Sequence, residues 1–168
     1  YVVERVSGET LGRRIAADPA FAPAREVLGR QCGEALARIH AIHPAGLPPL
    51  EVQDGRAVLN RYADIYRRSS NPRPVMEAAL KWMEARLPAP VQPRLVHGDF
   101  RNGNLMVDPD QGLAAVLDWE LAHLGDPAED LGWLCVNSWR FGVTDRLVGG
   151  FADLDSLLEA YRAAGGEP

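Results

Sequence analysis

The chain has 168 residues, of which 46% are hydrophobic and 24% are charged, and its formal net charge is −5. These values are typical of one soluble globular domain with its own core. Because the chain is acidic and has no long uncharged apolar stretch, we expect neither nucleic acid nor a membrane among its partners.

The first third of the chain predicts a strand, a turn and a long helix. Residues 1–6 alternate in the manner of a short strand, and a turn follows at Ser7-Gly8-Glu9. The pair Asp18-Pro19 is a helix-start signal, a cap followed by proline at the first helical position. Apolar residues then recur at helical spacing, which predicts a helix over about 21–43.

Two further helices are predicted over 54–68 and about 73–87. The side chains that we expect to point inward from them are Val58, Leu59, Tyr62, Ile65, Met76, Leu80 and Met83. A run of prolines then ends the helical region.

A compact β region comes next. Strands are predicted over 94–97, 105–107 and 113–118, and a polar loop over 98–104 separates the first two. The turn Asp108-Pro109-Asp110-Gln111-Gly112 makes the last two strands a hairpin.

The chain closes with two more predicted helices. Asp126-Pro127 carries a cap and a first-position proline, and Glu129 is its capping-box partner, so a helix should run to about Val136. A last helix is predicted over about 153–164, before a glycine pair. The fold class is therefore α+β, mostly helical with a small hairpin.

Cysteine and lysine usage exclude other classes of site. Cys32 and Cys135 lack the spacing of a metal site. We expect both to be free packing residues in a reducing compartment, and hence a cytoplasmic protein. Lys81 is the only lysine, which excludes the phosphate-binding loop G-x-x-x-x-G-K-[ST] at any other position.

The strongest functional signal is the loop His97-Gly98-Asp99-Phe100-Arg101-Asn102-Gly103-Asn104, followed by Asp118 at the end of the hairpin. A loop between two strands can aim Asp99 and Asn104 into one cleft, and the hairpin returns Asp118 beside Asn104. Phosphoryl transfer needs a carboxylate to orient the attacking hydroxyl and oxygen ligands for magnesium. The convergence of two acids and one amide therefore predicts an Mg²⁺–ATP site.

The segments HGDFRNGNLMV and VLDWELAHLGDPAEDLGWL resemble the aminoglycoside-phosphotransferase superfamily, most of all the branch found with acyl-CoA dehydrogenases. The start YVVERVSGETL is similar to the hinge between that family's two lobes, and ALARIHAIHP to its leucine–histidine helix. The resemblance implies a protein-kinase-like C-terminal lobe that transfers phosphate from ATP to a small hydroxylated molecule.

The resemblance also implies roles for individual residues. Asp99 is similar to the catalytic aspartate that orients the substrate hydroxyl, and Arg101 supports it. Asn104 and Asp118 resemble the magnesium ligands. The backbone of Glu4, Arg5 and Val6 resembles the hinge that meets adenine. His97 resembles a structural histidine of the loop, and Asp130 the aspartate that braces the loop backbone.

The chain departs from the family because no glycine-rich loop, strand lysine or helix glutamate precedes these motifs. We therefore expect residues 1–6 to be a hinge strand and residues 7–168 to be the C-terminal lobe, with the nucleotide-gripping N-terminal lobe as a missing partner. The isolated lobe is expected to be inactive and to self-associate through its strand edge.

Two other functions remain open from the sequence alone. A metal-dependent phosphoesterase would need histidine-rich ligands for paired metals, and a non-catalytic kinase-like binding module would need no intact site. The acceptor substrate is not specified by the sequence, although its pocket should be built from the helices of 54–87 and 121–164.

Overall fold

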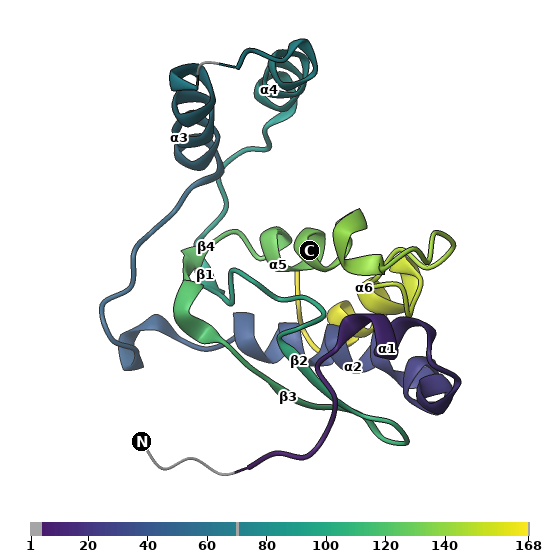
Figure 1. Cartoon of the computed structure of the whole chain (residues 1–168). Coiled ribbons are helices and arrows are strands. Elements are labelled where there is room, and N and C mark those ends of the chain that lie inside the picture. The colour runs from purple at the N-terminus through teal and green to yellow at the C-terminus, as the bar shows by residue number, and fades with distance from the viewer. Residues whose placement is uncertain (1–4, 70, 168) are drawn as a thin grey trace.

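Helices make up most of the computed structural model, which describes residues 5–69 and 71–167 (Figure 1). The α-helices are α1 (Gly12–Ala17), α2 (Ala22–His40), α3 (Gly55–Arg68), α4 (Pro74–Arg86), α5 (Ala128–Leu134) and α6 (Leu154–Ala163). Four 3-10 turns join them, namely η1 (Pro19–Phe21), η2 (Pro44–Gly46), η3 (Trp119–Leu121) and η4 (Asn137–Arg140).

Helix α2 is the centre of the body, and a capped 3-10 turn leads into it. The Asp18 carboxylate accepts a hydrogen bond from the Ala20 N–H at 3.0 Å and Pro19 opens η1, whereas α2 itself starts at Ala22 without a side-chain cap. The helix predicted over 21–43 is confirmed, but it ends at His40 because His43 already caps the next 3-10 turn. Helix α1, only 6 residues long, was not predicted from the sequence.

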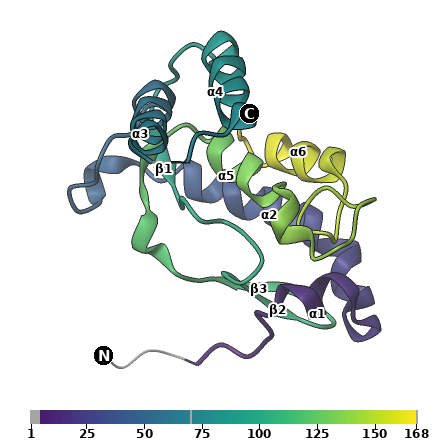
Figure 2. The same cartoon turned by 45° about the horizontal axis from the view of Figure 1, so that its top comes forward.

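The core forms where α2 packs against α6. Leu28, Cys32 and Leu36 of α2 belong to this core and have no exposed surface. Gly33 lets the two helices approach closely, since a Cβ atom there would lie 2.4 Å from the backbone oxygen of Leu157. The C-terminal helix α6 thus packs against α2 on the side away from the β2–β3 hairpin (Figure 2).

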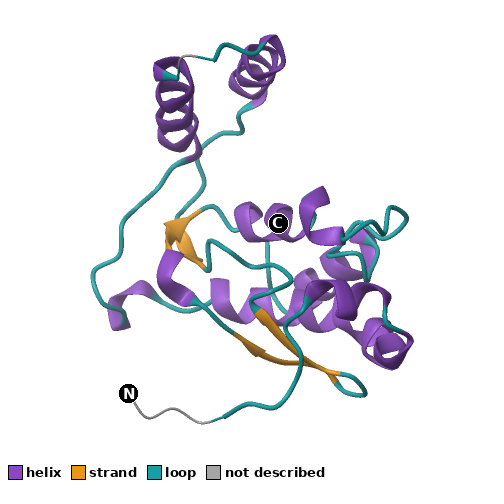
Figure 3. Ribbon diagram, in the orientation of Figure 1, coloured by secondary structure: helices purple, strands orange, loops and turns teal. Residues whose placement is uncertain are grey.

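Two small antiparallel sheets frame the polar loop (Figure 3). Strand β1 (Arg94–Val96) pairs with β4 (His123–Gly125), and β2 (Leu105–Asp108) pairs with β3 (Gly112–Val116). The predicted hairpin is confirmed, although β3 stops at Val116 and leaves Asp118 outside it. Strand β4 was missed. The loop over 97–104 therefore leaves one sheet and enters the other.

Helices α3 and α4 form a hairpin that stands away from the body (Figures 1 and 2). Both helices were predicted, and Asp54 caps α3 by accepting from the Ala57 N–H at 2.8 Å. The prediction of inward-facing side chains was wrong: Leu80 is buried, but Tyr62 and Ile65 are 58% and 52% exposed.

The physical reason is that the apolar faces of this hairpin meet each other rather than the core. They line an open groove of about 630 Å³ between the two helices. Its apolar lining is Val58, Leu59, Tyr62, Ile65, Met76, Leu80, Trp82, Met83, Leu87 and Pro88. Helical periodicity identifies an apolar face but not the surface that the face meets.

The predicted hinge strand falls mostly outside the described residues, which begin at Arg5. Arg5 and Val6 are exposed and irregular. The first pairing of the described chain is at Glu9, which exchanges two backbone hydrogen bonds of 2.9 Å with Val107 of β2. This bridge ties the incoming chain to the hairpin.

Within the described ranges, none of the helices is both long and apolar enough to cross a bilayer. The two cysteines are free thiols, with Cys32 buried and Cys135 half-buried.

Candidate active site

The loop that follows β1 is anchored first by His97, which is fully buried. Its Nδ1 accepts from the Asp99 N–H at 3.2 Å, so its Nε2–H donates to the Leu117 carbonyl at 2.9 Å. The ring therefore fixes the backbone of Asp99 and the chain just before Asp118. These contacts are of the kind expected for a structural His97.

Asp130 of α5 accepts hydrogen bonds from the backbone of the same loop. Its Oδ2 accepts from the His97 N–H at 2.7 Å, and its Oδ1 accepts from the Gly98 N–H at 2.9 Å. Asp130 has no exposed surface. A buried carboxylate is stable only when its oxygens are satisfied, and here two backbone donors satisfy it. These are the contacts that the family resemblance implied for Asp130.

Two buried hydrogen bonds connect Asp130 to the C-terminal helix α6. His40 of α2 places Nε2 at 3.1 Å from Asp130 Oδ2 and Nδ1 at 2.8 Å from the Tyr161 hydroxyl of α6. With Nε2 as the donor to the carboxylate, Nδ1 accepts from the hydroxyl. Three elements that are distant in sequence therefore converge behind the loop.

Gly98 allows the loop to turn sharply at this point. Its φ is +80°, and a Cβ atom would lie 2.5 Å from the Leu121 carbonyl oxygen. Only glycine tolerates both the left-handed conformation and the close approach.

The Asp99 carboxylate emerges from this anchored backbone and is surrounded by donors. Its Oδ1 accepts from Arg101 Nε at 2.9 Å and from Trp133 Nε1 at 2.7 Å. Its Oδ2 accepts from Asn104 Nδ2 at 2.7 Å. The Asp99 side chain retains 15% exposure. The carboxylate is thus held in one orientation while an edge stays accessible.

Asn104 is well suited to bind a hard cation. Its Nδ2 donates to both the backbone oxygen and the carboxylate of Asp99, at 3.0 and 2.7 Å. The amide is therefore oriented, and Oδ1 is left as the atom that could face a metal. An Mg²⁺ ion takes one or two such protein oxygens together with phosphate and water oxygens.

Asp118 follows β3 and is positioned through its neighbour. The Leu117 N–H donates to the Asn104 carbonyl at 2.8 Å, so residue 118 returns beside Asn104. Asp118 is exposed and adopts a left-handed conformation, with φ 65°. That conformation costs a non-glycine residue about 1–3 kcal/mol, and such strain clusters at functional sites. Asp118 thus offers an exposed carboxylate close in the chain path to the oriented amide of Asn104, and these two oxygen donors are the residues that could hold a divalent cation.

Several residues around Asp99 were not anticipated. Trp133 and Trp139 contact the Asp99–Arg101 pair, and His40 and Tyr161 support Asp130. No local pattern marks these side chains, because each makes its contact far along the chain. In addition, the Glu129 side chain does not complete the predicted capping box; its Oε2 lies 3.2 Å from His123 Nε2.

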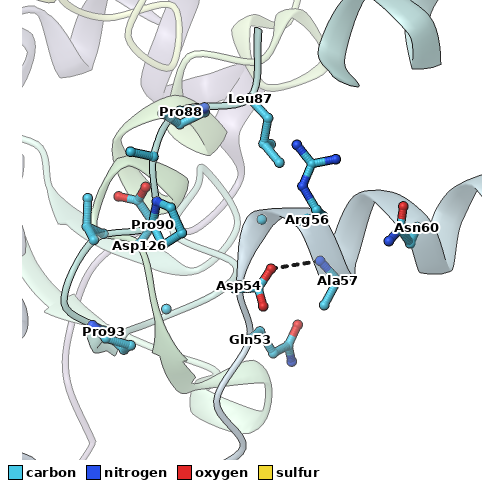
Figure 4. Close-up of a pocket in the computed structure, with 14 residues that line it drawn as sticks. Gln53, Asp54, Arg56, Ala57, Asn60, Leu87, Pro88, Pro90, Pro93 and Asp126 are labelled. Carbon is cyan, nitrogen blue, oxygen red and sulfur yellow. Dashed lines mark hydrogen bonds between the residues drawn. The ribbon is translucent and has the colours of Figure 1, made fainter. Parts of the chain in front are cut away.

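A cavity of about 640 Å³ lies at the base of the α3–α4 hairpin (Figure 4). Arg56 of α3 and Asp126, which precedes α5, come from opposite sides of it, and the segment 87–93 lines one wall. None of Asp99, Asn104 and Asp118 is among its lining residues.

The profile of the phosphotransferase enzyme family matches residues 1–166. Acyl-CoA dehydrogenase family member 11 of Rattus norvegicus is 32% identical over 142 residues, which cover 80% of this chain but 18% of the relative.

Two solved structures share the fold. A candidate aminoglycoside phosphotransferase from Ralstonia eutropha superimposes with a TM-score of 0.72 and 25% identity, covering 98% of this chain and 54% of that one. Macrolide 2'-phosphotransferase type I gives a TM-score of 0.66 at 25% identity, covering 86% and 46%. The chain thus spans about half the length of these structures and less than a fifth of the rat relative.

Proposed function

Because this chain belongs to the phosphotransferase enzyme family, we propose that it transfers the γ-phosphoryl group of ATP to a hydroxyl of a small molecule. The observation that carries the proposal is the Asp99 carboxylate, which three side-chain donors orient while 15% of the side chain stays exposed. The two solved phosphotransferases support the reaction class.

In this mechanism Asp99 orients the acceptor hydroxyl and accepts its proton as the oxygen attacks the phosphorus. Two donors occupy Oδ1 and one occupies Oδ2. The remaining lone pair of Oδ2 is therefore the one that receives the hydroxyl proton of the substrate. Such a positioned base contributes roughly 10²–10⁴-fold to the rate.

Asn104 Oδ1 and the Asp118 carboxylate would hold Mg²⁺, which neutralises phosphate charge when it is bound. Arg101 stays beside Asp99 with 26% of its side chain exposed, where its charge can face the transferring phosphate. Phosphoryl transfer depends mainly on positioning and charge of this kind.

The other half of the phosphate-binding apparatus is proposed to come from outside these 168 residues. Lys81 is the only lysine, and it lies exposed on α4. The hinge role of Glu4, Arg5 and Val6 toward adenine is likewise a proposal. The solved family structures, about twice as long as this chain, are consistent with a further segment.

A phosphoesterase with paired metals is less well supported. Such sites need several carboxylate and histidine ligands around the ions. In the described part of the chain no group of three or more His, Cys, Asp or Glu side chains is arranged to hold a metal.

The test compares Asp99→Asn with Asp118→Ala in protein expressed from the complete reading frame, with Mg²⁺, labelled ATP and a panel of small alcohols. Asp99→Asn should lower kcat by about 10²–10⁴-fold while calorimetry shows Mg–ATP binding near that of the wild type. Asp118→Ala should abolish the magnesium-dependent part of nucleotide binding.

Asp108→Asn is the matched control, because Asp108 accepts only from turn N–H groups at Asp110 and Gln111. It should leave kcat unchanged. Near-normal turnover by Asp99→Asn would show that Asp99 does not act on the acceptor.

A further inference from the structure

Four side chains form a closed cycle at the exposed edge of the candidate active site. Arg101 Nε and Trp133 Nε1 both donate to Asp99 Oδ1, at 2.9 and 2.7 Å. The Arg101 guanidinium lies 4.4 Å from the centre of the Trp139 ring. Trp139 in turn packs edge-to-face on Trp133, with ring centroids 5.6 Å apart. Each member of the cycle therefore restrains two others.

The cycle joins three separate elements. Asp99 and Arg101 come from the loop after β1, Trp133 from α5, and Trp139 from η4. Trp133 follows Asp130 by three residues, so both side chains leave the same face of α5. Asp130 holds the loop backbone from this face, and Trp133 holds the side chain of Asp99.

Arg101 is fixed on both sides. Its Nη1 also donates to the Asn102 carbonyl at 2.9 Å, while the indole of Trp139 covers one face of the guanidinium. A guanidinium over the face of an indole is an attractive pair. The guanidinium is thus positioned before any ligand arrives.

The Trp139 N–H also indicates that this side chain is more than packing material. Nε1 is buried, and no described protein group accepts from it. An indole kept only for packing would gain from replacement by phenylalanine, because an unpaired buried donor costs free energy. The ring surface that it offers to Arg101 and Trp133 is what distinguishes tryptophan at this position.

We propose that Trp133 and Trp139 are positioning residues for the phosphoryl transfer proposed above, on which this role rests. Trp133 occupies Asp99 Oδ1 so that only Oδ2 can meet the acceptor hydroxyl. Trp139 holds Arg101 beside that carboxylate. Neither indole needs to touch the reacting atoms.

The first experiment needs no activity and uses protein from the complete reading frame. Indole N–H signals are recorded by ¹⁵N–¹H NMR, and those of Trp82, Trp133 and Trp139 are assigned with single Trp→Phe variants. In Asp99→Ala the Trp133 signal should move upfield and exchange faster with solvent, since its carboxylate acceptor is gone. Trp82 lies exposed on α4, outside the cycle, and its signal should not move.

If Asp99→Ala does not fold, Trp139→Phe provides the same test through the Arg101 Nε–H signal, which should shift when the indole is removed. An unchanged Trp133 signal in folded Asp99→Ala, or an unchanged Arg101 signal in Trp139→Phe, would overturn the cycle.

The second experiment measures transfer kinetics in protein from the complete reading frame. Trp133→Phe keeps the ring but loses the donor, and kcat should fall about tenfold with the KM for ATP within about twofold of wild type. Asp108→Asn, whose side chain accepts only from the turn N–H groups of Asp110 and Gln111, is the control and should change neither value. A Trp133→Phe variant with normal kcat, or with only a raised KM for ATP, would overturn the positioning role alone. If the wild type transferred phosphate to no acceptor, the proposed function would be overturned, and the positioning role of Trp133 and Trp139 with it. The NMR experiment would still test whether the four side chains contact one another as described.

Discussion

Replacing Asp130 with alanine should be the most damaging single change to the loop. The substitution removes the acceptor of the His97 and Gly98 N–H groups, at 2.7 and 2.9 Å, and of His40 Nε2 at 3.1 Å. Each buried donor left without a partner costs about 1–3 kcal/mol. Because three buried donors lose one shared acceptor and their costs overlap, we expect a total loss of about 3–5 kcal/mol.

Urea denaturation followed by circular dichroism measures this loss. With a slope of about 2 kcal/mol per molar urea, the midpoint should fall by roughly 2 M. Asp153→Ala is the matched control, since it removes a single exposed cap that accepts from the Ser156 N–H at 2.7 Å. That control should cost only about 1 kcal/mol. Equal urea midpoints for the two variants would refute the inference that Asp130 stabilises the loop.

Two further predictions concern titratable groups. The hydrogen bond that His123 Nε2–H donates to the Glu129 carboxylate raises the pKa of His123 above its usual 6.5, against the effect of burial. A raised folded-state pKa stabilises the fold fully below about pH 6.5 and loses its effect as pH rises through the folded value. The stability difference between wild type and Glu129→Gln should therefore be largest near pH 5.5 and fade toward pH 8, and a difference that grows with pH would contradict the pair. Burial raises the pKa of Cys32 to about 12. At pH 8, Ellman's reagent should therefore leave Cys32 unmodified in native protein and react with both thiols in urea. If Cys32→Ser lowered the number of thiols that react in native protein, this prediction would be wrong.

Helix starts and the order of the polar motif could be read from the sequence because their causes are local. The caps at Asp18, Asp54 and Asp153 each accept from an N–H two or three residues later. The hairpin that returns Asp118 beside Asn104 depends on one turn and two short strands. For such features the interacting groups are neighbours in the chain, so their spacing carries the information.

The supporting contacts could not be read in this way. The bonds from Trp133 to Asp99 and from His40 to Asp130 join residues 34 and 90 positions apart. Strand β4 exists because it pairs with β1, and His123 lies opposite Val96 only once the fold has formed. A stretch of three residues such as His123–Gly125 is too short to show a periodicity that would mark it as a strand.

The sequence by itself determined the α+β class, the positions of the long helices, the loop that carries Asp99 and Asn104, and the hairpin after which Asp118 follows. Only the tertiary structure decided what surrounds them: the apolar face of α3 meets α4 and solvent instead of the core, and the Asp99 carboxylate is oriented by an indole from α5. The reason is physical. A periodic pattern records which side chains avoid water and a cap records a local hydrogen bond, but the partner of each face and of each buried polar atom is selected by the packing of the whole chain.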